Sequence, residues 1–252
     1  MHIPDEVCNI IALGYKDLKY YSDPSSRELF DFRKNVEMVI DTHVSRMVID
    51  LNRPPYSLPP RHPDGVVKLR TVDGKAVYRK ERFPDITLIH QLLMSYYFPY
   101  HAEIDRLLEV HDIKIAFDCH SMLPRGPLMQ KDAGQLRPMI CIANNGDKNG
   151  RPRKGGLATC PATWMCCLAD SFKEEFCLDH EVTINSPFKG GFITNAHYWH
   201  KGIPWVQLEV NRSLYEFDSL TDSKGEKGNG KHIMELNKKI WNTLQKFWDS
   251  IF

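Results

Sequence analysis

The chain has 252 residues, 42% of them hydrophobic, which is enough to build a substantial core. This composition excludes the disordered and fibrous classes of protein. The 33 lysines and arginines nearly balance the 32 aspartates and glutamates, so the net charge provides no general attraction to nucleic acid or to an anionic membrane. We therefore expect a small-molecule partner, expect no nucleic-acid or membrane partner, and leave the oligomeric state open.

The seven cysteines are scattered without a C-x-x-C pair, so neither a disulfide framework nor a cysteine-based zinc site is expected. No stretch approaches the ~18 consecutive apolar residues of a membrane span. Residues 1–6 lack the basic start and apolar run of a signal peptide. We expect a cytoplasmic protein whose thiols stay reduced.

Short apolar, β-branched runs predict buried strands, and apolar residues at three-to-four spacing predict helices between them. In chain order, the expected elements are a helix at 26–40, a strand at 47–51, a helix at 87–110, strands at 113–117 and 138–143, a helix at 163–176, strands at 182–184 and 205–210, and a helix at 231–248.

Loops are expected where proline, glycine and asparagine gather, at Pro54-Pro55, Pro59-Pro60, 144–156 and 223–231. The long polar segment 54–83 is interpreted either as a flap or insertion or as a plain surface loop. Alternation of strands and helices predicts an α/β fold with a mixed or mostly parallel sheet covered on both faces, with ligands bound at the carboxyl ends of its strands. No repeat or linker divides the chain, so one domain over 1–252 is expected.

The first pattern that indicates chemistry is Asp118-Cys119-His120-Ser121, at the end of a hydrophobic strand. A histidine in this position can bind a metal through one ring nitrogen while a neighbouring carboxylate orients the ring. The alternative is a histidine that only forms hydrogen bonds in a loop.

The second pattern brackets the apolar run at 47–51 with Arg46 and Arg53. Arginine suits the two-donor binding of a carboxylate. The alternative is a structural ion pair between either arginine and Asp50 or another acid.

In the third pattern, Gln207 and Glu209 alternate with the apolar residues of the strand at 205–210, so both project from one face. Glu209 is therefore either a residue on an exposed face or a base that activates a metal-bound water.

Several ordered motifs together resemble the N-formylglutamate amidohydrolase family, which belongs with the zinc carboxypeptidase-like hydrolases. The motifs are Ser22-Asp23 followed by Glu28-Leu29-Phe30-Asp31-Phe32, the segment 45–54, Pro99-Tyr100-His101, Asp118-Cys119-His120-Ser121, the segment 185–191 and Gln207-Leu208-Glu209. The resemblance implies a three-layer α/β/α sandwich around a mixed, mostly parallel sheet. It also implies one zinc ion per chain.

By the same resemblance, Asp23 and His120 are zinc ligands, and Asp118 and Ser121 support them. Read alone, Asp23 would instead be a cap for the helix expected at 26–40.

The resemblance makes Glu209 the general base, and it makes Arg46, Asn52 and Arg53 the clamp on the substrate's carboxylates. The expected reaction is metal-dependent hydrolysis of the N-acyl bond, N-formyl in the first instance, of an acidic amino acid. Two alternatives stay open: a related metallohydrolase acting on another N-acyl amino acid or a small peptide, and a non-catalytic carboxylate-binding protein that has lost its metal.

The sequence departs from the family at its start. Members carry a Pro-His-Ser-Gly segment, with a metal-ligating histidine at the end of the first strand, shortly before the Ile-Pro that is here Ile3-Pro4. We expect the chain as written to lack that strand and that ligand and to bind zinc poorly, unless His2 or His43 replaces the histidine.

Overall fold

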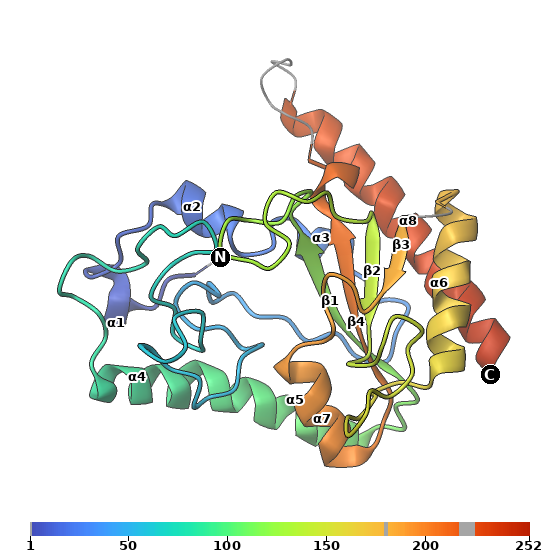
Figure 1. The fold of residues 1–252 in the computed structure, drawn as a ribbon, viewed down its shortest axis with the longest axis horizontal. Helices are drawn as coiled ribbons and strands as arrows, with labels where there is room; N and C mark the ends of the chain where they lie inside the picture. Colours follow the sequence, from blue (N-terminus) through green and yellow to red (C-terminus); the bar gives the residue numbers. More distant parts are fainter. Residues whose placement is uncertain (1, 179–180, 217–224) are drawn as a thin grey trace.

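A four-stranded sheet lies at the centre of the computed structural model, which describes residues 2–178, 181–216 and 225–252, with side chains from residue 230 in the last range. The strands are β1 (Ala116–Met122), β2 (Ile140–Ala143), β3 (Val182–Ile184) and β4 (Trp205–Asn211), in the order β1-β4-β2-β3. β1 runs parallel to β4 and β2 parallel to β3, whereas β2 and β4 are antiparallel. The expected α/β class with a mixed, mostly parallel sheet is confirmed (Figure 1).

Two helices, α6 (Ala162–Phe176) and α8 (Gly225–Ile251), lie together on one side of the sheet (Figure 1). The main core forms between them and alternate residues of the strands, because every second side chain of a strand faces the same way. Its members include Ile140, Ile142, Leu168, Phe172, Val206, Leu208, Val210, Leu236 and Ile240.

The opposite face of the sheet meets α5 (Phe98–Val110) and α7 (Phe192–Lys201), where Trp205 packs with Ile104 and Ile193. A second core, which includes Val48 and Leu92, lies among the elements of the first hundred residues. The other elements are α1 (Asp5–Cys8), α2 (Tyr15–Tyr20), α3 (Ser26–Leu29), α4 (Ile86–Leu92), the π-helical turn η1 (Leu93–Tyr97) and the 3-10 turn η2 (Arg212–Leu214).

Two predicted elements are wrong. The helix expected at 26–40 ends at Leu29, since Phe30 and Phe32 both enter the main core and residues two apart cannot share one face of a helix. The run 47–51 is buried but forms turns that begin at Ser45, which accepts backbone bonds from Val48 and Ile49. Periodicity alone cannot separate such a buried run from a strand.

The remaining strands and helices lie close to their predicted places, with three differences. β1 begins later than expected and continues to Met122, so Asp118 and His120 lie on the strand itself. α7 was not predicted. α8 begins at Gly225, so the loop expected at 223–231 is helical from that residue on, and 223–224 lie outside the described residues.

The segment 54–83 is irregular, but it is not a plain surface loop. Val66, Val67 and Val77 are fully buried in the second core. The Asp50 amide donates to the Val66 carbonyl, which joins this insertion to the turns at 47–51. No helix in the described part of the chain has the length and apolar character needed to cross a membrane.

Candidate active site

Polar side chains gather on the face of the sheet opposite α6 and α8. The parallel register of β1 and β4 places His120 beside Glu209 and Asp118 beside Gln207. Antiparallel β2 places Cys141 on the other side of Glu209. Neighbouring strands are ~4.8 Å apart, so the register alone brings the acid–histidine pattern and the strand glutamate together.

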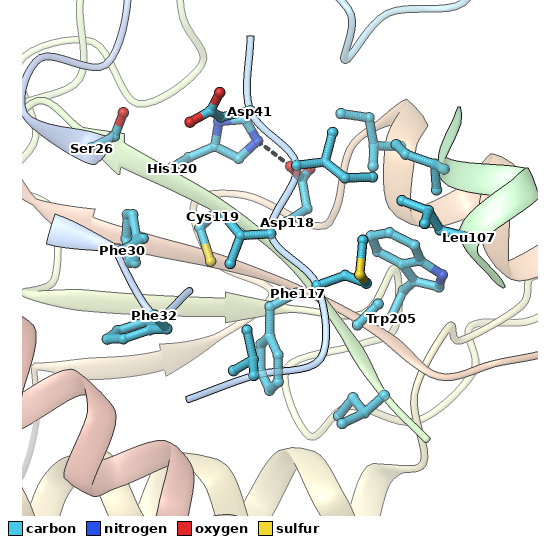
Figure 2. A pocket seen from close by; sticks show the side chains of 18 of the residues that line it. Ser26, Phe30, Phe32, Asp41, Leu107, Phe117, Asp118, Cys119, His120 and Trp205 are labelled. Carbon is cyan, nitrogen blue, oxygen red and sulfur yellow. Dashed lines mark ion pairs between the residues drawn. The ribbon is translucent and has the colours of Figure 1, made fainter. Parts of the chain in front are cut away.

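His120 lies between two carboxylates. Its Nε2 is 2.9 Å from Oδ1 of Asp118, the ion pair drawn in Figure 2, and its Nδ1 is 3.5 Å from Oδ2 of Asp23. Burial disfavours a charged imidazole, but Asp118, Asp23 and Glu209 together outweigh it and hold the pKa of His120 well above its ordinary value. The nearby negative charge therefore favours a cation at this position.

Asp23 is fixed by residues distant in sequence. Its Oδ2 accepts from Arg46 at 2.7 Å, and its Oδ1 accepts from the Ser121 amide at 3.2 Å and the Ser121 hydroxyl at 3.0 Å. Although burial opposes its charge, Arg46 and His120 lower the pKa of Asp23 below its ordinary value. Its backbone has φ 51°, a left-handed conformation that aspartate tolerates better than most residues. The N-cap of α3 is Ser25, so the interpretation of Asp23 as a side-chain cap is wrong.

Glu209 is 5% exposed, so it does not lie on an exposed face. Burial raises its pKa to about 7, against the opposing effect of His120. Gln207 Nε2 donates to its Oε1 at 2.7 Å, as expected for side chains on one face of a strand. A buried carboxyl whose pKa lies near neutrality can both accept and return a proton, which is what general acid–base catalysis requires.

Both arginines of the predicted clamp are already in contact with acids. Arg46 pairs with Asp23 and with Asp50, at 3.2 Å for the latter, and Arg53 pairs with Asp64 at 2.8 Å. Both arginines therefore form structural ion pairs, as the alternative interpretation of this pattern predicted.

Asn52 is held from two sides. Its Nδ2 donates to Asp118 Oδ2 at 2.9 Å, and its Oδ1 accepts from the Ile193 amide in the first turn of α7 at 2.9 Å. Asn52 thus connects the acid beside His120 to a helix that the sequence did not predict.

Two cavities meet at this cluster and share Asp23, Arg46, Asn52 and His120. The larger, about 910 Å³, is mostly lined by apolar side chains, among them Phe30, Phe32, Leu107, Phe117 and Trp205 (Figure 2). The smaller, about 170 Å³, is lined by Gln207 and Glu209 and by six cations. We take the smaller pocket as the reaction site because it alone contains the candidate base.

Two of the pocket's cations, Arg212 and Lys189, had no role assigned to them from the sequence. Arg212 is buried, and it donates to the Ser121 hydroxyl at 3.1 Å and to the Tyr20 carbonyl. Lys189 lies in the predicted motif 185–191 and lines the same pocket. Neither has a local sequence pattern that distinguishes it from the other cations of the chain, so only its place in the fold reveals it.

The donor pair at the cluster fits zinc in its spacing. Two ligands of a tetrahedral zinc with bonds of ~2.0–2.1 Å are about 3.3 Å apart, close to the separation of His120 Nδ1 and Asp23 Oδ2. The contact between Asp118 and Nε2 leaves Nδ1 available for a metal. Among the described residues, no group of three histidines, cysteines, aspartates or glutamates is arranged to hold a metal, so a third ligand is not identified.

The fold and this buried acid–histidine cluster define an α/β protein with a candidate acid–base site. Residues 1–216 match the family model of N-formylglutamate amidohydrolase, and the chain belongs to that family. It is an amidohydrolase.

Named relatives agree with this family. The N-formylglutamate deformylase of Pseudomonas putida is 29% identical over 197 residues, which cover 75% of this chain and 68% of the relative. That of Pseudomonas aeruginosa is 26% identical over 196 residues, covering 74% and 68%.

Solved structures agree with the fold. The N-formylglutamate amidohydrolase of Ralstonia eutropha superposes with a TM-score of 0.69 at 16% identity, covering 97% of this chain and 89% of that one. A gene product of Agrobacterium tumefaciens gives 0.62 at 18% identity, covering 100% and 86%.

The close approach of Gly191 to Asn52 can be tested by Gly191→Ala. A Cβ at Gly191 would lie 2.1 Å from Asn52 Oδ1, so Asn52 must shift. Overpacking of this kind costs about 1–3 kcal/mol of unfolding free energy, measured by denaturant titration. Gly14→Ala is the matched control, because Gly14 is also a helix N-cap and has no atom within 4 Å of its added Cβ. Equal losses in the two variants would contradict the proposed contact.

Proposed function

We propose that the chain hydrolyses the N-formyl amide bond of N-formylglutamate or a similar acidic N-acyl amino acid, with the help of one zinc ion. The observation that carries this proposal is the position of Glu209, buried with a pKa of about 7 and directly across from His120 on the neighbouring strand. The names of the Pseudomonas relatives support the choice of substrate.

Asp23 and His120 would hold the zinc together with a ligand that is not yet assigned, and Asp118 would orient His120. Zinc supplies a Lewis acid that polarises the amide carbonyl and lowers the pKa of water toward ~7. Glu209 takes the proton of the attacking water and delivers it to the leaving nitrogen. The amide bond is thereby cleaved to formate and the free amino acid.

Preference for an acidic substrate is supported by the charge of the smaller pocket, whose six cations outnumber the three acids that line it, Asp23, Asp64 and Glu209. Its six cations are Arg46, Arg53, Lys68, Arg137, Lys189 and Arg212. Arg46, Asn52 and Arg53 remain the predicted clamp, in which the two guanidinium groups would share their donors between protein acids and substrate carboxylates.

A related hydrolase of larger N-acyl amino acids is the second candidate, because the cavity of about 910 Å³ reaches the same His120 and could accept an apolar acyl group. Hydrolysis rates of N-formylglutamate, N-acetylglutamate and N-hexanoylglutamate, measured beside zinc content by elemental analysis, separate the two. Fastest turnover of the hexanoyl compound would favour the second candidate. Absence of turnover of all three by the zinc-loaded chain would reject both.

Glu209→Gln should abolish turnover while leaving the zinc content and the fold nearly unchanged, because it removes a proton acceptor at almost constant volume. Loss of a general base lowers kcat by about 10²–10⁴-fold. The exposed Glu181→Gln serves as the control and should keep the parent rate. If the Glu209 variant kept more than about a third of kcat, Glu209 would not be the base.

Asp118→Asn should weaken zinc binding roughly 10- to 100-fold, because residues that orient a metal-bound histidine affect affinity to this extent. Competition with a chromogenic chelator measures the change. Asp112→Asn is the matched control, since Asp112 is an exposed acid whose ion pair is with Lys114. Unchanged affinity in the Asp118 variant would reject His120 as a ligand supported by Asp118.

A further inference from the structure

Lys189 differs from the other cations of the smaller pocket because no carboxylate pairs with it in the described part of the chain. Each of the other five has a carboxylate within 2.7 to 3.8 Å. No carboxylate or hydrogen-bond acceptor contacts the Lys189 ammonium among the residues that the structure describes. The other five cations share four carboxylates, those of Asp23, Asp50, Asp64 and Asp132. A cation without such a partner in this pocket favours an anionic group from outside the protein.

The backbone at Lys189 is fixed against the site. Its carbonyl accepts from the Asn145 amide, and the preceding Phe188 packs its ring against the Arg137 guanidinium at 4.9 Å. On the other side, Gly190 has φ 114° and Gly191 lies against the Asn52 side chain. The loop therefore fixes the backbone of Lys189 beside the pocket, whereas a lysine on an unanchored loop would be spread over the surface.

On this basis we propose that Lys189 determines specificity by binding the side-chain carboxylate of the acidic substrate. The proposal rests on the proposed function and assigns to Lys189 one of the two carboxylates that the substrate carries. The predicted clamp of Arg46, Asn52 and Arg53 then binds the α-carboxylate. A lysine can fill this role because its ammonium is a point charge with three donors on a flexible stem, which can follow a carboxylate at the end of a mobile side chain.

Three substrates distinguish the two carboxylates. N-formylglutamate carries both, N-formylglutamine has its side-chain carboxylate replaced by an amide, and N-formylisoglutamine has its α-carboxylate replaced by an amide. The kcat/KM of each is measured for the zinc-loaded parent chain and for Lys189→Gln.

Loss of a charged hydrogen bond at an exposed cation should lower kcat/KM about tenfold for N-formylglutamate and N-formylisoglutamine, chiefly through KM. N-formylglutamine should be little affected. Lys189→Arg should restore most of the preference for the side-chain carboxylate. Lys148→Gln removes a charge outside the pocket and should leave all three ratios at the parent values.

The alternative outcomes each overturn the inference in a recognisable way. Equal loss on all three substrates would make Lys189 a structural residue of the loop. Loss on N-formylglutamate and N-formylglutamine with none on N-formylisoglutamine would assign Lys189 to the α-carboxylate. If the parent chain hydrolysed none of the three, the proposed function would fail and this inference with it.

Discussion

The geometry of this site depends on one constraint. Carboxylates are buried against arginine, lysine and histidine side chains beside one face of the sheet. Asp50 is 2% exposed and contacts both Arg46 and Lys68, and Lys68 itself is 3% exposed. An isolated buried charge is very costly, and removal of one partner from a buried pair costs about 3–5 kcal/mol because the other is left uncompensated. Separation of Arg46 from Asp50 would therefore cost free energy of this size, so the pair holds Arg46 and the Asp23 that it contacts in place.

A polar face of this kind needs an apolar face behind it. In β4, Val206, Leu208 and Val210 pack against the core of α6 and α8, while Gln207 and Glu209 face the pocket. Those apolar runs are what made β2, β3 and β4 predictable from sequence. The prediction failed at 26–40, where the tertiary packing of Phe30 and Phe32 overrides the helical pattern. It also failed at 47–51, where local backbone hydrogen bonds to the Ser45 carbonyl form turns in a buried apolar run that resembles a strand.

The sequence predicted which residues of the site carry chemistry, but it did not predict how they are arranged in space. Local patterns indicated His120 and Glu209 separately, but their adjacency comes from the pairing of β1 with β4, which are far apart in the sequence. Asp23 was interpretable as a helix cap because its true partners, Arg46 and Ser121, are 23 and 98 residues away in the sequence. The role of Lys189 is inferred from the ion pairs that the other cations of the pocket form. No local sequence pattern indicates those pairs.

The segment that carries Asn52 and Arg53 shows how distant packing sets the pocket. Leu51 O lies 3.0 Å from His101 Nε2, and His101 Nδ1 lies 2.9 Å from His197 Nε2. These two histidines stand on α5 and α7, and Tyr97 adds a hydrogen bond to the Arg53 carbonyl at 2.8 Å. Because hydrogen bonds to helices hold this irregular segment at both ends, its side chains are positioned more firmly than those of an unanchored loop. Substitutions at α5 and α7 therefore act on the pocket through the backbone of this segment, without contact with the reacting atoms.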